Sequence, residues 1–179
     1  MRKHSKEYLE NLTPYKCYEI LVEGNQRFIN NLNTNHDHLE MINETRDGQY
    51  PFAVVLSCMD SRASAELVFD QGLGDLFSIR VAGNIVNNDI LASIEYAVKY
   101  VGSKVLMVLG HTECGAIKSA KAGVKDGHIT SLLDRMGGRQ LAGHILNAAA
   151  LGDEAAIAQM IDPLDADQLR SLVTALAAQ

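Results

Sequence analysis

The sequence predicts an α/β fold: a mostly parallel β-sheet flanked by helices. Three short apolar runs, at residues 52–56, 76–81 and 105–109, have the length and composition of buried strands. Helical periodicity fills the intervals between these runs, and strands that alternate with helices are typical of a parallel sheet. Ligands of such sheets bind beyond the carboxyl ends of the strands, so the residues that follow each run are the first candidates for a site.

The chain before the first strand is predicted to be helical. Thr13 and Pro14 form a strong helix start, with Thr as the N-cap and Pro at the first position. Gly24 interrupts the helix at a cost of about 1 kcal/mol relative to Ala, which a close backbone approach would explain. Residues 30–43 suggest a bend into a second short helix, and a turn is expected at 47–48. Apolar residues recur at helical spacing in the first helix: Ile20, Leu21, Phe28, Ile29 and Leu32.

Turns and helices are also predicted after the first strand. A short helix is expected over 63–70 and a turn over 72–75, with Asp70 and Asp75 as solvated or helix-end charges. After the second strand ends at Ala82-Gly83-Asn84, a helix should run from about Asp89 to Gly102.

A further helix should start at Thr112 or Glu113, just after the third strand. Its predicted buried side carries Ala116, Ile117, Ala120 and Val124.

The composition changes near residue 137. No lysine follows Lys125, no aromatic residue follows Tyr100, and alanine becomes frequent. We therefore predict an α/β domain with an N-terminal helical arm over residues 1–136, and an all-helical C-terminal tail over 137–179.

Composition also bounds the functional class. The net charge of −6 argues against a nucleic-acid-binding protein. No apolar run approaches the roughly 18 residues that span a bilayer, and no apolar segment follows the basic N-terminus as in a signal peptide, so a cytoplasmic protein is expected. Three cysteines without an export signal indicate metal ligands or a reactive thiol rather than a disulfide framework.

Metal-type ligands follow two of the predicted strands. Cys58, Asp60 and Arg62 alternate after the first strand, and alternate residues of an extended chain point the same way. His111 and Cys114 follow the third strand. Two thiolates and an imidazole suit Zn²⁺, and three protein ligands leave a fourth position open, as in catalytic zinc sites. The competing interpretation is a chance His-x-x-Cys pair beside a small buried cysteine.

The charged pair suggests that the zinc site does chemistry. A bound zinc ion can lower the pKa of a water ligand from 15.7 to about 7, which gives hydroxide at neutral pH. Asp60 is in reach to orient that hydroxide. Arg62 could keep Asp60 ionised, because an opposite charge nearby lowers a carboxylate pKa.

The motifs SCMDSR, GLGDLFSIRVAGN and GHTECGAIKSA, in this order, resemble the β-class carbonic anhydrases, as do GNQRF and DGQYPF. The resemblance covers roughly residues 17–136. It implies one Zn²⁺ per chain held by Cys58, His111 and Cys114, with Asp60 and Arg62 as the catalytic dyad. It also implies that Asp60 could become a fourth ligand in a closed state. The implied substrate-binding residues are Gln49, Phe77, Ala82, Gly83 and Tyr96.

The implied activity is the reversible hydration of CO₂ to bicarbonate and a proton. The implied assembly is a homodimer or a larger homo-oligomer built from dimers, with the N-terminal helices wrapped over the partner. Two alternatives stay open: a related zinc hydrolase on the same scaffold, for example one acting on carbon disulfide, or a non-catalytic zinc-stabilised assembly module. The tail lacks the further strand of the family, so we expect the tail or a partner chain to cover the free edge of the sheet.

Overall fold

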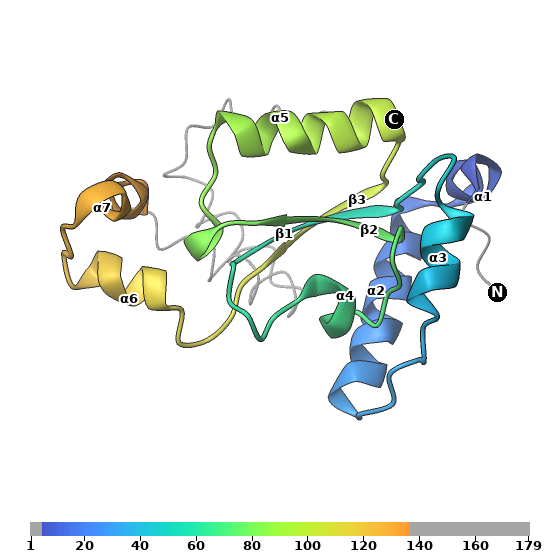
Figure 1. Cartoon of the computed structure of the whole chain (residues 1–179), viewed down its shortest axis with the longest axis horizontal. Coiled ribbons are helices and arrows are strands. Elements are labelled where there is room, and N and C mark those ends of the chain that lie inside the picture. Colours follow the sequence, from blue (N-terminus) through green and yellow to red (C-terminus); the bar gives the residue numbers. More distant parts are fainter. Residues whose placement is uncertain (1–4, 137–179) are drawn as a thin grey trace. The chain divides into compact units, whose positions relative to one another are not determined.

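The computed structural model of the chain describes residues 5–136, which contain a three-stranded sheet (Figure 1). The strands are β1 (Ala53–Ser57), β2 (Leu76–Arg80) and β3 (Val105–Leu109), in the order β2-β1-β3. The central strand β1 is buried along its whole length, whereas β3 is partly exposed throughout. This arrangement confirms the predicted α/β class and the positions of all three strands. The predicted helical tail over 137–179 lies outside the described residues.

Helices occupy most of the intervals between the strands. They are α1 (Lys6–Asn11), α2 (Pro14–Ile29), α3 (His38–Glu44), α4 (Ala65–Val68), the 3₁₀ turn η1 (Ala82–Asn84), α5 (Asn88–Tyr96), the π-helical turn η2 (Ala97–Val101), α6 (Gly115–Lys121) and α7 (Gly127–Asp134). None of these described helices is both long and apolar enough to cross a membrane.

The described chain divides into two compact units. The first holds residues 5–56, 61–79 and 86–107, and the second holds 57–60, 80–85 and 108–136. The first unit contains nearly all of the sheet, and the second contains the ends of the strands with the segments that follow them.

In the first unit, α5 lies on one face of the sheet, and α2 and α4 lie on the other (Figure 1). The start of α2 is as predicted, because the Thr13 side chain accepts a hydrogen bond from the Lys16 N–H at 3.1 Å. Gly24 is buried where α2 meets the end of α4. A Cβ atom there would lie 1.7 Å from the Phe69 carbonyl oxygen, which confirms the predicted close backbone approach.

Two aspartates of the first unit depart from the prediction. Asp70 and Asp75 are 3% and 4% exposed, so their interpretation as solvated charges is wrong. The Asp75 carboxylate accepts a hydrogen bond from the Gly72 N–H at 2.8 Å and closes the predicted turn. Asp70 is surrounded by donors from the segment that follows α2. Both carboxylates can be buried because hydrogen-bond donors replace water around them, from the same turn for Asp75 and from a segment far away in the sequence for Asp70.

In the second unit, two predictions about the chain after β3 are wrong. Helix α6 begins at Gly115 rather than at 112 or 113, because Glu113 adopts a positive φ of 61° that is incompatible with a helix. Its apolar side is not buried in the described part of the chain, where Ile117 is 39% exposed. Helix α7 was not predicted, although Asp126 at its N-cap position precedes apolar residues at helical spacing.

Candidate metal centre

The second unit brings Cys58, His111 and Cys114 together. One ligand atom from each residue lies within 4.8 Å of the other two, and the Cys58 and Cys114 Sγ atoms are 3.9 Å apart. Both thiols are free and buried, while the imidazole is half-buried. Two thiols and an imidazole converging in this way form a donor set for a soft or borderline divalent metal such as zinc.

Each of these residues follows a strand directly or through a short turn. Cys58 is the first residue after β1, and His111 comes two residues after the end of β3. Cys114 is the N-cap residue of α6, so its position is set by the sharp turn at Glu113. The sheet therefore delivers the donors from two neighbouring strand ends, as the sequence predicted.

The His111 ring is oriented for metal binding. Its Nδ1 atom lies 2.9 Å from the Thr112 carbonyl oxygen, which can only accept a hydrogen bond, so this contact places the ring proton on Nδ1. The Nε2 atom then carries a lone pair. Nε2 is buried, and no hydrogen-bond partner for it lies among the described residues. A buried imidazole nitrogen without a partner beside two thiols fits a metal ligand.

The two thiols do not ionise alike. Burial alone would raise the pKa of Cys58, but hydrogen bonds to its sulfur, led by the Gly83 N–H at 3.3 Å, more than offset burial and lower it. Burial raises the pKa of Cys114, and the neighbouring Cys58 sulfur adds to that rise. A second thiolate is therefore opposed by the first, and a divalent cation between them would remove this repulsion.

Asp60 lies close to the three donors. Its Oδ2 atom is 3.8 Å from the His111 Nδ1 atom, and its side chain is 18% exposed. However, β1 ends at Ser57 and residues 58–60 are not part of a strand, so the predicted strand alternation does not extend through Asp60. Arg62 is exposed in a turn of the first unit. Its pairing with Asp60 stays a prediction.

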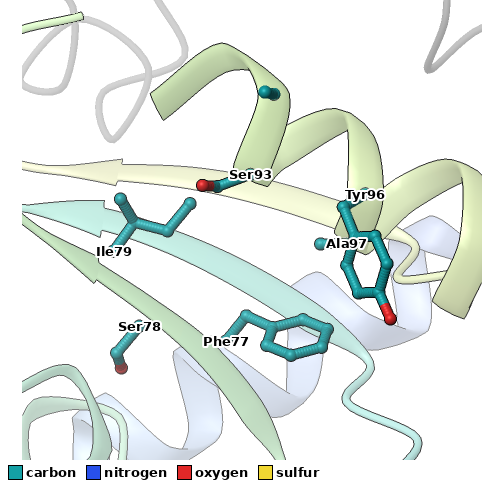
Figure 2. A pocket seen from close by; sticks show the side chains of 7 residues that line it. Phe77, Ser78, Ile79, Ser93, Tyr96 and Ala97 are labelled. Carbon is teal, nitrogen blue, oxygen red and sulfur yellow. The ribbon is translucent and has the colours of Figure 1, made fainter. Parts of the chain in front are cut away.

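The predicted substrate-binding residues fall in several places. Phe77 on β2 and Tyr96 on α5 line one open pocket of about 380 Å³ in the first unit (Figure 2). Ala82 and Gly83 form part of η1 in the second unit, where Gly83 contacts Cys58 as described. Gln49 is exposed shortly before β1. The remaining pocket-lining residues are Ser78, Ile79, Ala92, Ser93 and Ala97.

Two residues near the centre were not predicted as functional. Arg80 is the last residue of β2 and Asn84 is the last residue of η1. Their side chains donate hydrogen bonds to backbone carbonyls of the segments that carry the candidate ligands. The available signal was their position, because polar residues at the end of β2 and just after it lie at the same carboxyl edge of the sheet as the residues after β1 and β3.

Comparison with protein families and curated proteins extends the sequence resemblance. A family model described as "Carbonic anhydrase" matches residues 53–174. The match therefore continues past residue 136, further than the motifs predicted. Carbonic anhydrase 2 of Mycobacterium tuberculosis is 41% identical over 123 residues, which are 66% of this chain and 58% of the relative. Carbonic anhydrase of Mycolicibacterium smegmatis is 33% identical over 169 residues, which are 94% of this chain and 80% of the relative.

Solved structures show the same fold. The β-carbonic anhydrase CcaA superposes with a TM-score of 0.55 at 26% identity, over 90% of this chain and 82% of CcaA. A tetrameric β-carbonic anhydrase from Sordaria macrospora has a TM-score of 0.54 at 23% identity, over 80% of this chain and 74% of its own. This chain spans only 58% of the length of the M. tuberculosis relative. The family match nevertheless covers well over half of the chain, including all three candidate ligands, and the chain belongs to the β-class carbonic anhydrase family.

Proposed function

We propose that the chain binds one Zn²⁺ ion through Cys58, His111 and Cys114 and catalyses the reversible hydration of CO₂ to bicarbonate and a proton. The observation that carries this proposal is the convergence of two buried thiols with a buried imidazole nitrogen that has no other partner among the described residues. Membership of the carbonic anhydrase family supports the choice of metal and reaction.

A zinc ion at this site would supply a nucleophile at neutral pH by lowering the pKa of a coordinated water. Three protein donors leave a fourth position for that water or for substrate. Two thiolates neutralise the charge of the dication and weaken it as a Lewis acid, so a neighbouring group that accepts a hydrogen bond from the water is needed.

We propose Asp60 for this role. Its carboxylate lies 3.8 Å from His111 Nδ1, next to the proposed ligands. As an ionised acceptor, it would orient the water's proton and hold the oxygen toward the substrate. We propose that Arg62 keeps Asp60 ionised. If Asp60 instead occupies the fourth position itself, the site is closed, and its open fraction then depends on pH.

CO₂ is small and apolar and offers few groups for hydrogen bonding, so it should be held by apolar surface. Phe77 and Tyr96 provide such surface in the pocket of the first unit, and Ala82 and Gly83 lie beside the proposed ligands in the second. Gln49 can donate a hydrogen bond to bicarbonate from its exposed position. We propose these five residues as the substrate-binding set.

We further propose a homo-oligomer built from dimers. Several large apolar side chains on and after α2 are exposed in the single chain, including Tyr15 at 70% and Ile29 at 61%. Burial of such a face is a strong driving force for association. In the order β2-β1-β3 the strand β3 is an edge of the sheet. The expectation that the tail or a partner chain covers this edge concerns parts that lie outside the described residues. Three free cysteines favour a reducing compartment such as the cytoplasm.

The test compares metal content and CO₂ hydration in matched variants. His111→Ala should lose both zinc and activity, and His128→Ala, which removes an exposed imidazole, should keep both. Cys58→Ala should behave like His111→Ala, while Cys17→Ala should keep its zinc. Full zinc occupancy in His111→Ala would overturn the ligand assignment.

Asp60→Asn separates the metal site from the chemistry. This variant should keep its zinc and lose most turnover, because an amide cannot act as the ionised acceptor. Hydration at the wild-type rate by Asp60→Asn would refute the role of Asp60. Zinc bound without hydration at any pH would instead favour a different small substrate or a non-catalytic, zinc-stabilised assembly.

A further inference from the structure

The segment 80–84 contacts both parts of the chain that carry the proposed zinc ligands. The first residue of the segment is Arg80, whose guanidinium donates two hydrogen bonds. Its Nε atom donates to the Cys58 carbonyl oxygen at 3.2 Å, and its Nη2 atom donates to the Asp60 carbonyl oxygen. From its last residue, Asn84 Nδ2 donates to the Leu109 carbonyl oxygen at 2.6 Å. These contacts lie within the second unit. One short segment thus joins the strand ends of β1 and β3.

Arg80 acts where the strand pairing of β1 stops. The last backbone hydrogen bond there runs from the Val81 N–H to the Ser57 carbonyl oxygen at 3.1 Å. Beyond it the chain leaves the sheet, and the guanidinium supplies donors to the Cys58 and Asp60 carbonyls instead. A guanidinium holds its N–H groups in a rigid planar fork, so it can fix two acceptors at once. The backbone is therefore held on both sides of Met59.

Asn84 makes a similar contact to the end of β3. Its side chain is buried, and its backbone has a positive φ of 51°, a conformation that asparagine tolerates better than most residues. This conformation accompanies the bond from the side chain to Leu109, the last residue of β3 and two residues before His111. Between the two side chains, the Gly83 N–H donates to the Cys58 Sγ atom at 3.3 Å.

We propose that Arg80 and Asn84 are positioning residues for the metal centre. Arg80 sets the direction in which Cys58 and Asp60 leave the sheet, and Asn84 sets the start of the turn that carries His111. Neither side chain is itself a ligand. Their loss should therefore widen the spread of ligand positions and weaken metal binding without removing a donor atom. This inference rests on the proposed zinc site.

The decisive variant is Arg80→Lys. Lysine keeps the positive charge but replaces the fork with a single ammonium group, which cannot reproduce two aligned N–H donors. The matched control is Arg46→Lys, the same substitution at an exposed arginine that pairs with exposed Asp47. Asn84→Gly tests the second contact, because glycine accepts the positive φ and removes only the side-chain donor.

Zinc affinity is measured by competition with a chromophoric chelator, and the visible spectrum of the Co²⁺-substituted protein reports ligand geometry. Arg80→Lys and Asn84→Gly should bind zinc about 10–100-fold more weakly than wild type, the usual effect of losing a group that orients a metal ligand. Their Co²⁺ spectra should be altered, and Arg46→Lys should match wild type in both measurements.

Three results would overturn the inference, and they are distinguishable. Wild-type protein that binds no zinc would remove the proposed metal site and the inference with it. Wild-type zinc affinity and Co²⁺ spectra in both variants would refute the inference and leave the proposed function intact. A lower unfolding midpoint of the metal-free variants with unchanged zinc affinity would show that the two residues support only the fold.

Discussion

Asp70→Asn is a perturbation whose effect can be worked out from the structure. The Asp70 side chain is 1% exposed and lies just after α4. Its Oδ1 atom accepts a hydrogen bond from the Thr34 N–H at 2.9 Å and lies 3.3 Å from the His36 Nε2 atom. Its Oδ2 atom accepts from the Thr34 hydroxyl at 2.9 Å and from Arg27 Nε. One carboxylate thus ties the end of α2 and the segment after it to the end of α4.

Asparagine keeps the shape of this side chain and tolerates the positive φ of 47° at this position, so the backbone should not be strained. However, the asparagine amide has only one acceptor oxygen. Its NH₂ group would face hydrogen-bond donors that the second carboxylate oxygen of Asp70 now satisfies. Hydrogen bonds to charged groups contribute about 1.5–3 kcal/mol each. Because the Arg27 side chain is 36% exposed, water can solvate it after the change and reduce the loss. We expect a destabilisation of about 2–3 kcal/mol at neutral pH.

The effect should depend on pH in a defined direction. Burial opposes ionisation of Asp70, but the hydrogen bonds from Arg27 and Thr34 more than offset burial, so its pKa is lowered from the ordinary value of 3.8. An aspartate with a lowered pKa in the folded state contributes stability above its unfolded-state pKa, and this contribution is lost as pH falls through the folded-state pKa. The difference in the free energy of unfolding between wild type and Asp70→Asn should therefore be largest at neutral pH, and it should decrease progressively as the pH falls below about 4.

Urea unfolding followed by circular dichroism, repeated from about pH 7 down to about pH 3, measures this gap. The control is Asp47→Asn, which removes an exposed aspartate paired with exposed Arg46 and should leave the midpoint unchanged. Equal stability of wild type and Asp70→Asn at neutral pH would refute the reasoning. So would a gap that stays equally wide at the lowest pH.

Further predictions concern packing, thiol reactivity and metal removal. Gly24→Ala should destabilise the protein by about 1–3 kcal/mol, because the clash with the Phe69 carbonyl exceeds the helix-propensity gain of about 1 kcal/mol, and urea unfolding would show it. Gly115→Ala, with open space around its Cβ, should not be destabilised. Burial raises the pKa of Cys17 to about 11, so at pH 8 roughly one in a thousand molecules carries its thiolate, and iodoacetamide should label it only after unfolding. Removal of zinc by a chelator should lower the thermal midpoint and make Cys58 available to the same reagent, as peptide mass spectrometry would detect.

The fold was largely predictable because its main signals are local. The three strands are short apolar runs bounded by turn residues, and Thr13 and Pro14 are the typical first residues of a helix, which predicts the start of α2. The packing role of Gly24 followed from the cost of glycine inside a helix, which needs a compensating contact. These inferences depend on backbone preferences that any tertiary arrangement must satisfy.

Burial was harder to predict, because it depends on what covers a residue. The apolar side of α6 has the right spacing for a core face, yet Ile117 is 39% exposed in the described part of the chain. Aspartate usually lies on the surface, but Asp70 is buried and accepts hydrogen bonds from Arg27 and Thr34, which are far from it in the sequence. Contacts between segments about 40 residues apart leave no periodic signal in the sequence.

The candidate metal site was predictable to the level of its donor atoms. Cys58, His111 and Cys114 follow two strands whose ends meet in a parallel sheet. Arg80 and Asn84 could be placed near the site from their position at the end of β2, but their contacts could not be predicted, because their partners are backbone carbonyls, which every residue possesses. Only the folded chain shows which carbonyls these side chains reach.

The central claim is tested most directly by stopped-flow CO₂ hydration across about pH 6 to 9, with zinc quantified on the same sample. We predict one zinc per chain and a hydration rate that rises with pH, since the nucleophile forms by loss of a proton. A steeper rise than a single proton allows would indicate that Asp60 closes the site at low pH. Protein that holds no zinc, or that holds one zinc per chain and hydrates no CO₂ at any pH, would contradict the proposed function.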